Sequence, residues 1–148
     1  MRVVIDTNVF ISAVFFGGKP GVVLDAFRAG QLEMILSAEI LKEYSEALER
    51  LSARFPSVDA SGLLSIVAAG CTTVMPGVIN DQVCADPDDD KFITAALGGN
   101  SKTIVSGDKH LPDVNGYAGI DILGPADFVE RCLTERSSTS EQHENQGL

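Results

Sequence analysis

The sequence predicts an α/β fold with a mostly parallel sheet, arranged as one domain. Short β-branched or apolar runs alternate along the chain with longer stretches of helical periodicity, which is the pattern of strands joined by helices. The chain has 148 residues, of which 45% are hydrophobic and 22% charged, and this length and composition suit one globular domain. We expect that domain to span residues 1–133. Residues 134–148 are polar and almost without apolar side chains, so we expect them to form a disordered tail.

Five segments are expected to form strands, because each is short, apolar or β-branched, and bounded by turn residues. The first ends at Asp6, and the fourth delivers Ser106 and Asp108 at its tip. The five segments are residues 3–5, 34–36, 72–75, 103–105 and 120–123.

Helices are expected between these strands. The clearest follows Ser37, a suitable N-cap, because apolar residues there recur at a spacing of three to four. An acidic turn over residues 85–90 precedes a helix that Asp90 is expected to cap, and Pro125 begins the last helix. The apolar stripe after Ser37 consists of Ile40, Leu41, Tyr44, Leu48 and Leu51. The other expected helices cover residues 22–29, 63–69 and 91–97.

The net charge narrows the classes of function. Eleven Lys and Arg against 21 Asp and Glu give −10, which excludes a protein that holds nucleic acid mainly by a large basic surface. It does not exclude a nuclease whose metal ions supply the local positive charge. No apolar stretch approaches the ~20 residues of a membrane helix, and no signal peptide is visible. Three cysteines without C-x-x-C spacing predict neither a disulfide framework nor a thiolate zinc site, so we expect a cytoplasmic protein without membrane contact.

Acidic residues stand where α/β folds bind ligands, at the carboxyl ends of the strands. Asp6 and Asp108 follow expected strands, and an Asp-rich block over residues 86–90 lies at the start of a helix. Glu43 lies beside the apolar stripe, where it can be partly buried. Carboxylates that share a cleft repel one another and favour a bound cation. Because the chain has only two histidines, we expect oxygen ligands and therefore Mg²⁺ or Mn²⁺, which support phosphoryl hydrolysis.

Four motifs carry these acidic residues. They are Ile5-Asp6-Thr7-Asn8-Val9-Phe10-Ile11-Ser12, Ile40-Leu41-Lys42-Glu43-Tyr44, Asp86-Pro87-Asp88-Asp89-Asp90-Lys91-Phe92 and Ile104-Val105-Ser106-Gly107-Asp108-Lys109. In this order and spacing they resemble the PIN-domain ribonucleases, in particular the toxin-like proteins of bacterial toxin–antitoxin pairs. The resemblance covers residues 1–133. It implies a three-layer α/β/α sandwich with a five-stranded parallel sheet in the order 3-2-1-4-5.

The resemblance also implies the site and its chemistry. The family's catalytic, metal-binding acids fall on Asp6, Glu43, Asp90 and Asp108, with Asp90 preferred to its neighbours because Ile93 and the following alanines match the family's spacing. The implied activity is endonucleolytic cleavage of RNA with Mg²⁺ or Mn²⁺, leaving a 5′-phosphate. The implied partners are a small antitoxin protein and a second copy of the chain. Thr7, Asn8 and Ser106 match polar positions that, in the family, orient water, metal ligands or the scissile phosphate. Asp86 is either an outer ligand or a turn residue.

Two points depart from a typical relative. Many relatives carry an aspartate two residues after the fourth acid, where this chain has His110. The negative net charge would leave substrate capture to the metal and to local basic residues. The candidates are Lys19, Lys91, Lys102 and Lys109.

Two alternative functions stay open at this point. The first is a catalytically inactive module of the same fold that binds a nucleotide or RNA, against which the four intact acids argue. The second is a receiver-like signalling domain, which would require an aspartate after a middle strand and adjacent acids near the first strand. Asp59 reads as a loop residue entering a helix, and Asp6 stands alone near the first strand.

Overall fold

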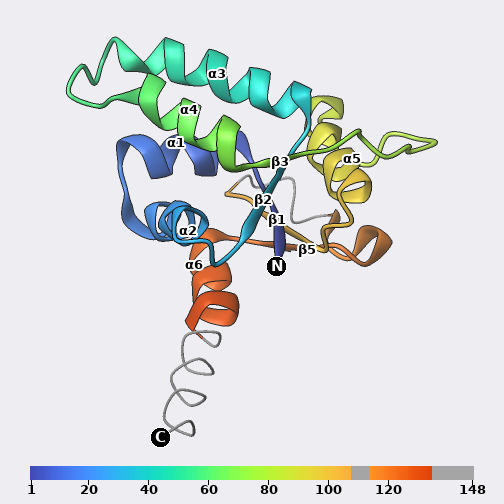
Figure 1. Cartoon of the computed structure of the whole chain (residues 1–148). Helices are drawn as coiled ribbons and strands as arrows, with labels where there is room; N and C mark the ends of the chain where they lie inside the picture. Colours follow the sequence, from blue (N-terminus) through green and yellow to red (C-terminus); the bar gives the residue numbers. More distant parts are fainter. Residues whose placement is uncertain (108–113, 135–148) are drawn as a thin grey trace, which may run out of the picture.

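A five-stranded parallel sheet forms the centre of the computed structural model, which describes residues 1–107 and 114–134 (Figure 1). The strand order is β3-β2-β1-β4-β5, and each neighbouring pair is parallel, so the expected topology is confirmed. The strands are β1 (Arg2–Ile5), β2 (Glu33–Leu36), β3 (Thr72–Thr73), β4 (Thr103–Val105) and β5 (Asp121–Leu123).

Helices cover both faces of this sheet. Helix α2 packs against α1 and α6, and α3 packs against α1 and α4. Helix α5 returns the chain from the β3 edge to β4 and packs against β1, β2 and β4. The helices are α1 (Thr7–Phe15), α2 (Gly18–Arg28), α3 (Ala38–Ser52), α4 (Ala60–Gly70), α5 (Asp90–Gly98) and α6 (Pro125–Phe128), which continues as the π-helical η4 (Val129–Thr134).

The first helix was not expected from the sequence, and the second begins earlier than the sequence indicated. The apolar run over residues 10–16 lies in α1, whose first turn is capped by Asp6: the Val9 N–H donates to its carboxylate at 2.8 Å. Helix α2 begins at Gly18 instead of residue 22, because Gly17 adopts a positive φ of 73° that turns the chain directly from one helix into the next.

Helix α3 confirms the expected apolar stripe and carries it into the core. Ser37 accepts the Ile40 N–H at 3.3 Å and so caps the helix. The Tyr44 ring stacks on Phe10 with centroids 4.1 Å apart, and its hydroxyl donates to the Ile5 carbonyl. Helix α3 is thereby fixed to the end of β1, which sets the position of Glu43 relative to Asp6.

Two expectations about the later elements are wrong. Strand β3 ends at Thr73 instead of residue 75, although the Val74 N–H still donates to the Leu36 carbonyl at 2.9 Å. Asp90 does not cap the helix; it is the first residue of α5, and its carboxylate accepts the N–H groups of Cys84 and Val83 at 2.7 and 3.2 Å. The cap position belongs to Asp89, after the 3₁₀ turn η1 (Pro87–Asp89).

The expected tail, residues 134–148, lies outside the described residues from 135 onward, and the domain boundary stays a prediction. Within the described ranges, no single helix has the length and apolar character needed to cross a membrane. The pair α1 and α2, bent by 93°, meets that test only when its two helices are joined.

Candidate active site

Asp6 stands at the carboxyl end of the central strand β1, with its side chain fixed by two donors. The residue is 2% exposed, and its backbone N–H donates to the Val105 carbonyl of the neighbouring strand at 3.0 Å. One carboxylate oxygen accepts from Val9 at the start of α1, and the other accepts from the Ser106 hydroxyl at 2.5 Å. Ser106 is also 2% exposed and directly follows β4. Two adjacent strand ends therefore hold this carboxylate in one orientation.

Glu43 reaches the same region from α3. One of its oxygens accepts the Thr7 hydroxyl, and Thr7 is the residue that follows Asp6 in the chain. Its side chain is 30% exposed, which confirms the expected partial burial. The short helix-to-strand link through Tyr44 and Ile5 brings Glu43 to the end of β1, although 36 residues separate it from Thr7 in the sequence.

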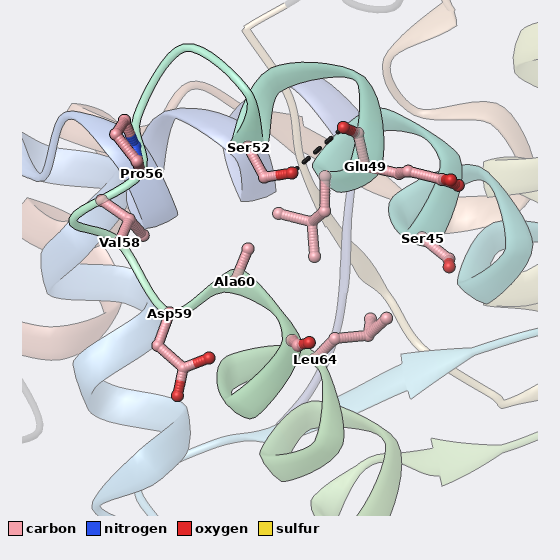
Figure 2. A pocket seen from close by; sticks show the side chains of 10 residues that line it. Ser45, Glu49, Ser52, Pro56, Val58, Asp59, Ala60 and Leu64 are labelled. Atoms are coloured by element: carbon pink, nitrogen blue, oxygen red, sulfur yellow. Dashed lines mark hydrogen bonds between the residues drawn. The ribbon is translucent and has the colours of Figure 1, made fainter.

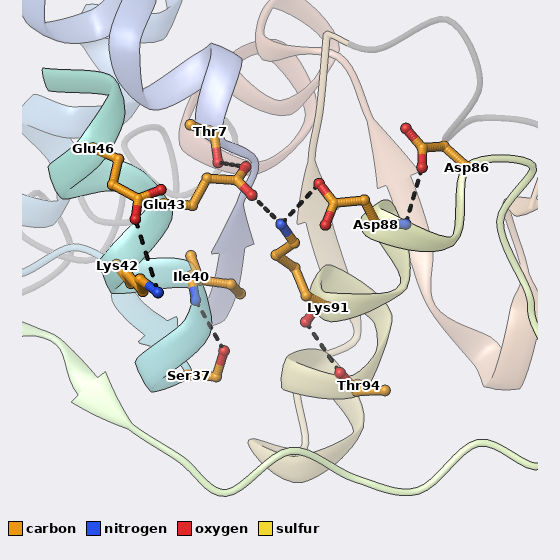
Figure 3. Close-up of polar contacts among 10 residues, drawn as sticks. All are labelled: Thr7, Ser37, Ile40, Lys42, Glu43, Glu46, Asp86, Asp88, Lys91 and Thr94. Atoms are coloured by element: carbon orange, nitrogen blue, oxygen red, sulfur yellow. Dashed lines mark hydrogen bonds and ion pairs between the residues drawn. The ribbon is translucent and has the colours of Figure 1, made fainter. Parts of the chain in front are cut away.

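Lys91 joins Glu43 to the Asp-rich turn (Figure 3). Its ammonium Nζ donates to the second Glu43 oxygen and lies 3.2 Å from Oδ2 of Asp88. The Lys91 side chain is only 5% exposed, whereas that of Asp88 is 72% exposed. The ion pairs therefore connect α3, η1 and α5 across the mouth of the site.

The charge of Lys91 is stable in this setting. Burial alone would lower the pKa of the Lys91 ammonium, but hydrogen bonds and ion pairs with Glu43 and Asp88 outweigh it and raise the pKa above its usual value. Burial raises the pKa of the Tyr44 hydroxyl well above its ordinary range, and the charges of Asp6 and Glu43 raise it further. Beside the same acids, the charged form of Lys91 and the neutral form of Tyr44 are thus favoured.

In the Asp-rich turn, Asp86 and Asp90 accept backbone N–H groups, whereas Asp88 and Asp89 line the acidic pocket. Asp86 is exposed and accepts the Asp88 N–H at 3.0 Å, so it is a turn residue here. Asp88 and Asp89 line the pocket that also contains Asp6 and Glu43. Asp90, preferred from the sequence, has both oxygens on the loop at residues 83–84 and is not among the lining residues. Its role as a ligand stays a prediction.

The acidic pocket is a hollow of about 310 Å³ at the carboxyl edge of the sheet. Ligands of α/β proteins bind at this edge, so the position agrees with the sequence-based expectation. Its lining residues are Asp6, Thr7, Asn8, Glu43, Glu46, Ala47, Arg50, Asp88, Asp89 and Phe92.

A second hollow, of about 430 Å³, lies between α3 and α4 (Figure 2). Its lining includes Glu49 and Asp59, but Asp59 caps α4 by accepting the Gly62 N–H at 3.0 Å. None of the catalytic or metal-binding residues expected from the resemblance lines this hollow. Despite its larger volume we assign the site to the acidic pocket, where strand ends and paired polar side chains meet.

The donors of the acidic pocket fit a hard cation by their chemistry, since Asp6, Glu43, Asp88 and Asp89 offer carboxylate oxygens. The spacing of these side chains, however, does not by itself form a complete metal site. Within residues 1–107 and 114–134, no three His, Cys, Asp or Glu side chains are grouped as a metal site. The expected fourth acid, Asp108, lies outside the described residues, as do Lys109 and His110.

Sequence reasoning missed two residues of the pocket and misjudged the role of Lys91 beside it. Glu46 and Arg50 lie one and two turns after Glu43 on α3, a spacing that would have placed all three on one face. Lys91 was expected to capture substrate, yet it is buried and paired within the site. Its spacing of three residues from Asp88 on a helical segment was the signal that could have indicated this pair.

Comparisons with known proteins agree with this fold. The PIN domain family model matches residues 2–110. An uncharacterized protein of Methanocaldococcus jannaschii is 33% identical over 141 residues, covering 88% of this chain and 90% of that protein. The crystal structure of VapBC2 from Rickettsia felis, bound to a DNA fragment from their promoter, matches with a TM-score of 0.56. That match has 12% identity and covers 84% of this chain and 98% of the other, which shows a likeness of fold.

Proposed function

Because the chain belongs to the PIN-domain family, we propose that it is a metal-dependent endoribonuclease and the toxin of a toxin–antitoxin pair. PIN domains are typically nucleases and generally depend on metal ions. One observation carries the proposal: the carboxylate that directly follows β1 and carboxylates of α3 and η1 line a single pocket at the carboxyl edge of the sheet. Such a cluster has a cost in mutual repulsion that a bound cation offsets.

We propose Asp6, Glu43 and Asp89 as the ligands of Mg²⁺ or Mn²⁺ within the described residues, with Asp90 and Asp108 as the further ligands expected from the sequence. When bound, such an ion activates a water molecule and stabilises charge on the leaving oxygen of a phosphodiester. The side chains around the pocket would orient the metal-binding carboxylates and the substrate.

The hydroxyls of Ser106 and Thr7 each donate to one acid, which fixes the oxygens of Asp6 and Glu43 that face the pocket. Asn8 is exposed at the pocket wall, where its amide can donate to a substrate phosphate.

The test is cleavage of a mixed RNA pool by the chelator-stripped full chain after Mn²⁺ or Mg²⁺ is returned. We expect the wild-type protein to cut only with metal, and Asp6→Asn and Glu43→Gln to lose the activity. Asp25→Asn, an exposed carboxylate on α2, is the matched control and should cut like wild type. Equal cutting by all four proteins would identify a contaminating nuclease and would overturn the proposal as tested.

One observation favours the alternative of an inactive RNA-binding or nucleotide-binding module. The Lys91 ammonium already neutralises part of the charge of Glu43 and Asp88, so the acids are less in need of a metal ion. This alternative predicts RNA binding without cleavage and no change in melting temperature when Mn²⁺ is added.

A receiver-like domain is not supported, because its sheet has the strand order 2-1-3-4-5, whereas here β1 lies between β2 and β4.

We propose a small protein antitoxin as the partner, with a basic side chain that enters the acidic pocket. The complementary charge of the pocket supports this choice. VapBC2, whose chain has the same fold, is itself named as a complex. Co-purification with the product of an adjacent small gene, and inhibition of RNA cleavage by it, would test the pair. The proposed homodimer would be tested by light scattering, and the proposed cytoplasmic location by fractionation.

A further inference from the structure

We propose that Lys91 is a built-in cation that takes the place of one divalent ion, so that the acidic pocket binds a single Mn²⁺ or Mg²⁺. The inference rests on the proposed function, since it concerns how many metal ions that site accepts. It assigns to Lys91 a role in positioning and charge balance, and none in contacting substrate.

The ammonium occupies a position between carboxylates of different elements. Lys91 comes from the first turn of α5, Glu43 from α3 and Asp88 from η1, and the Lys91 Nζ contacts an oxygen of each acid (Figure 3). A cation that bridges two carboxylates is what a second metal ion would be in a two-metal hydrolase. The position is therefore already filled by the chain itself.

Burial fixes the ammonium there. The Lys91 side chain is 5% exposed, and lysines are almost never this buried unless they are paired. By contrast Lys42, on α3, is 77% exposed and lies 3.9 Å from Glu46. A surface lysine such as Lys42 can leave its partner at little cost, whereas Lys91 has no comparable access to solvent.

Glu43 shows the consequence for metal binding. Its two oxygens accept from Thr7 and from Lys91, so an ion that bridges Glu43 and Asp88 would have to displace the ammonium or lie against it. Two like charges in such proximity repel strongly. An ion can instead approach the Glu43 oxygen that accepts from Thr7, in the pocket that Asp6 and Asp89 also line.

The experiment counts bound ions directly. Mn²⁺ is titrated into chelator-stripped full-length wild type, Lys91→Met and Lys42→Met, with free Mn²⁺ followed by electron paramagnetic resonance. We expect one ion per chain for wild type and for the Lys42→Met control. For Lys91→Met, which keeps the length of the side chain without its charge, we expect two ions per chain.

Melting curves with and without Mn²⁺ provide a second readout. Without metal, Lys91→Met should melt at a lower temperature than wild type, because Glu43 and Asp88 lose their counter-charge. With saturating Mn²⁺ the rise in melting temperature should be larger for Lys91→Met than for wild type. Should Lys91→Met fail to melt cooperatively, Lys91→Gln, which keeps a donor for Glu43, replaces it.

The outcomes separate this inference from the proposed function. Two ions in wild type, or one ion in both wild type and Lys91→Met, would overturn the role of Lys91 and leave a metal-dependent nuclease intact. An unchanged stoichiometry with weakened RNA binding in Lys91→Met would instead make Lys91 a substrate contact. Absence of Mn²⁺ binding to every protein would overturn both proposals.

Discussion

Ser106 illustrates how a single hydroxyl sets the geometry of the acidic pocket. It is buried after β4 and donates to the Asp6 oxygen that the α1 cap does not use. Ser106→Ala should leave the fold intact but let the Asp6 carboxylate rotate. Because outer partners of a metal ligand are worth roughly 10–100-fold in metal affinity or activity, we expect losses of that size in both.

The measurement is Mn²⁺ affinity together with RNA cleavage, with Ser45→Ala on α3 as the control outside the acidic pocket. Wild-type affinity in Ser106→Ala would mean that the Val9 cap alone orients Asp6.

Tyr44 fixes α3 to the end of β1, and its contribution to the free energy of unfolding depends on pH. Tyr44→Phe keeps the stacking on Phe10 but removes the hydrogen bond to the Ile5 carbonyl, so we expect a loss of about 1–3 kcal/mol in the free energy of unfolding. In the unfolded chain a tyrosine loses its proton near pH 10, whereas burial raises the native pKa of Tyr44 well above that.

The unfolded state therefore binds fewer protons above about pH 10, and wild-type stability falls as the pH rises through this value. Tyr44→Phe should lose less stability over the same interval. Denaturant unfolding at pH 7 and at about pH 10.5 measures the difference, with Tyr117→Phe on the surface as control. Parallel pH profiles for wild type and Tyr44→Phe would contradict the assignment.

At the scale of elements, the start of α5 holds the acidic turn against the preceding loop. Asp90 accepts two loop N–H groups, so Asp90→Ala should destabilise the metal-free protein by about 1–3 kcal/mol. Asp89→Ala should cost less stability and should mainly lower the affinity for Mn²⁺. Unfolding in chelator and Mn²⁺ titration of both variants test this division. A normal stability of Asp90→Ala together with lost Mn²⁺ binding would show that Asp90 acts only as a ligand and does not hold the loop.

The other end of α5 depends on close backbone packing. A Cβ on Gly98 would lie 2.9 Å from the Gly77 nitrogen and closer still to the Met75 carbonyl, so Gly98→Ala must push the segment after β3 away. We expect a loss of about 3 kcal/mol or more. Gly21→Ala, inside α2 with open space around it, should instead gain about 0.5–1 kcal/mol. Thermal unfolding compares the two variants. Equal effects on stability would show that the segment at Met75 and Gly77 moves away from Gly98 at little cost.

The errors of the sequence analysis arise where tertiary contacts decide local structure. Ser37 could be predicted as a cap because its donor lies three residues away on the same helix. Asp90 could not be placed, because four neighbouring carboxylates look alike in sequence and only the loop at residues 83–84 selects one of them. Helix α1 was missed as a helix since its apolar run resembles a buried strand as much as a buried helix.

At the scale of the whole molecule, alternation of strands and helices predicted the α/β class, and the motif resemblance predicted the strand order. The convergence of Asp6 and Glu43 on one pocket follows from that topology, since β1 is central and α3 packs across its end. The pairing of Lys91 with Glu43 could not be predicted, because 48 residues separate the two and no local rule joins them.

Metal-dependent hydrolysis of RNA in the acidic pocket would leave characteristic ends on the product. A defined RNA is incubated with chelator-stripped wild type or Asp6→Asn, with and without Mn²⁺, and the fragment ends are identified by mass spectrometry. We expect 5′-phosphate ends from wild type with Mn²⁺ only, and no fragments from Asp6→Asn. Fragments with 2′,3′-cyclic phosphate ends, formed without metal or equally by Asp6→Asn, would contradict this mechanism.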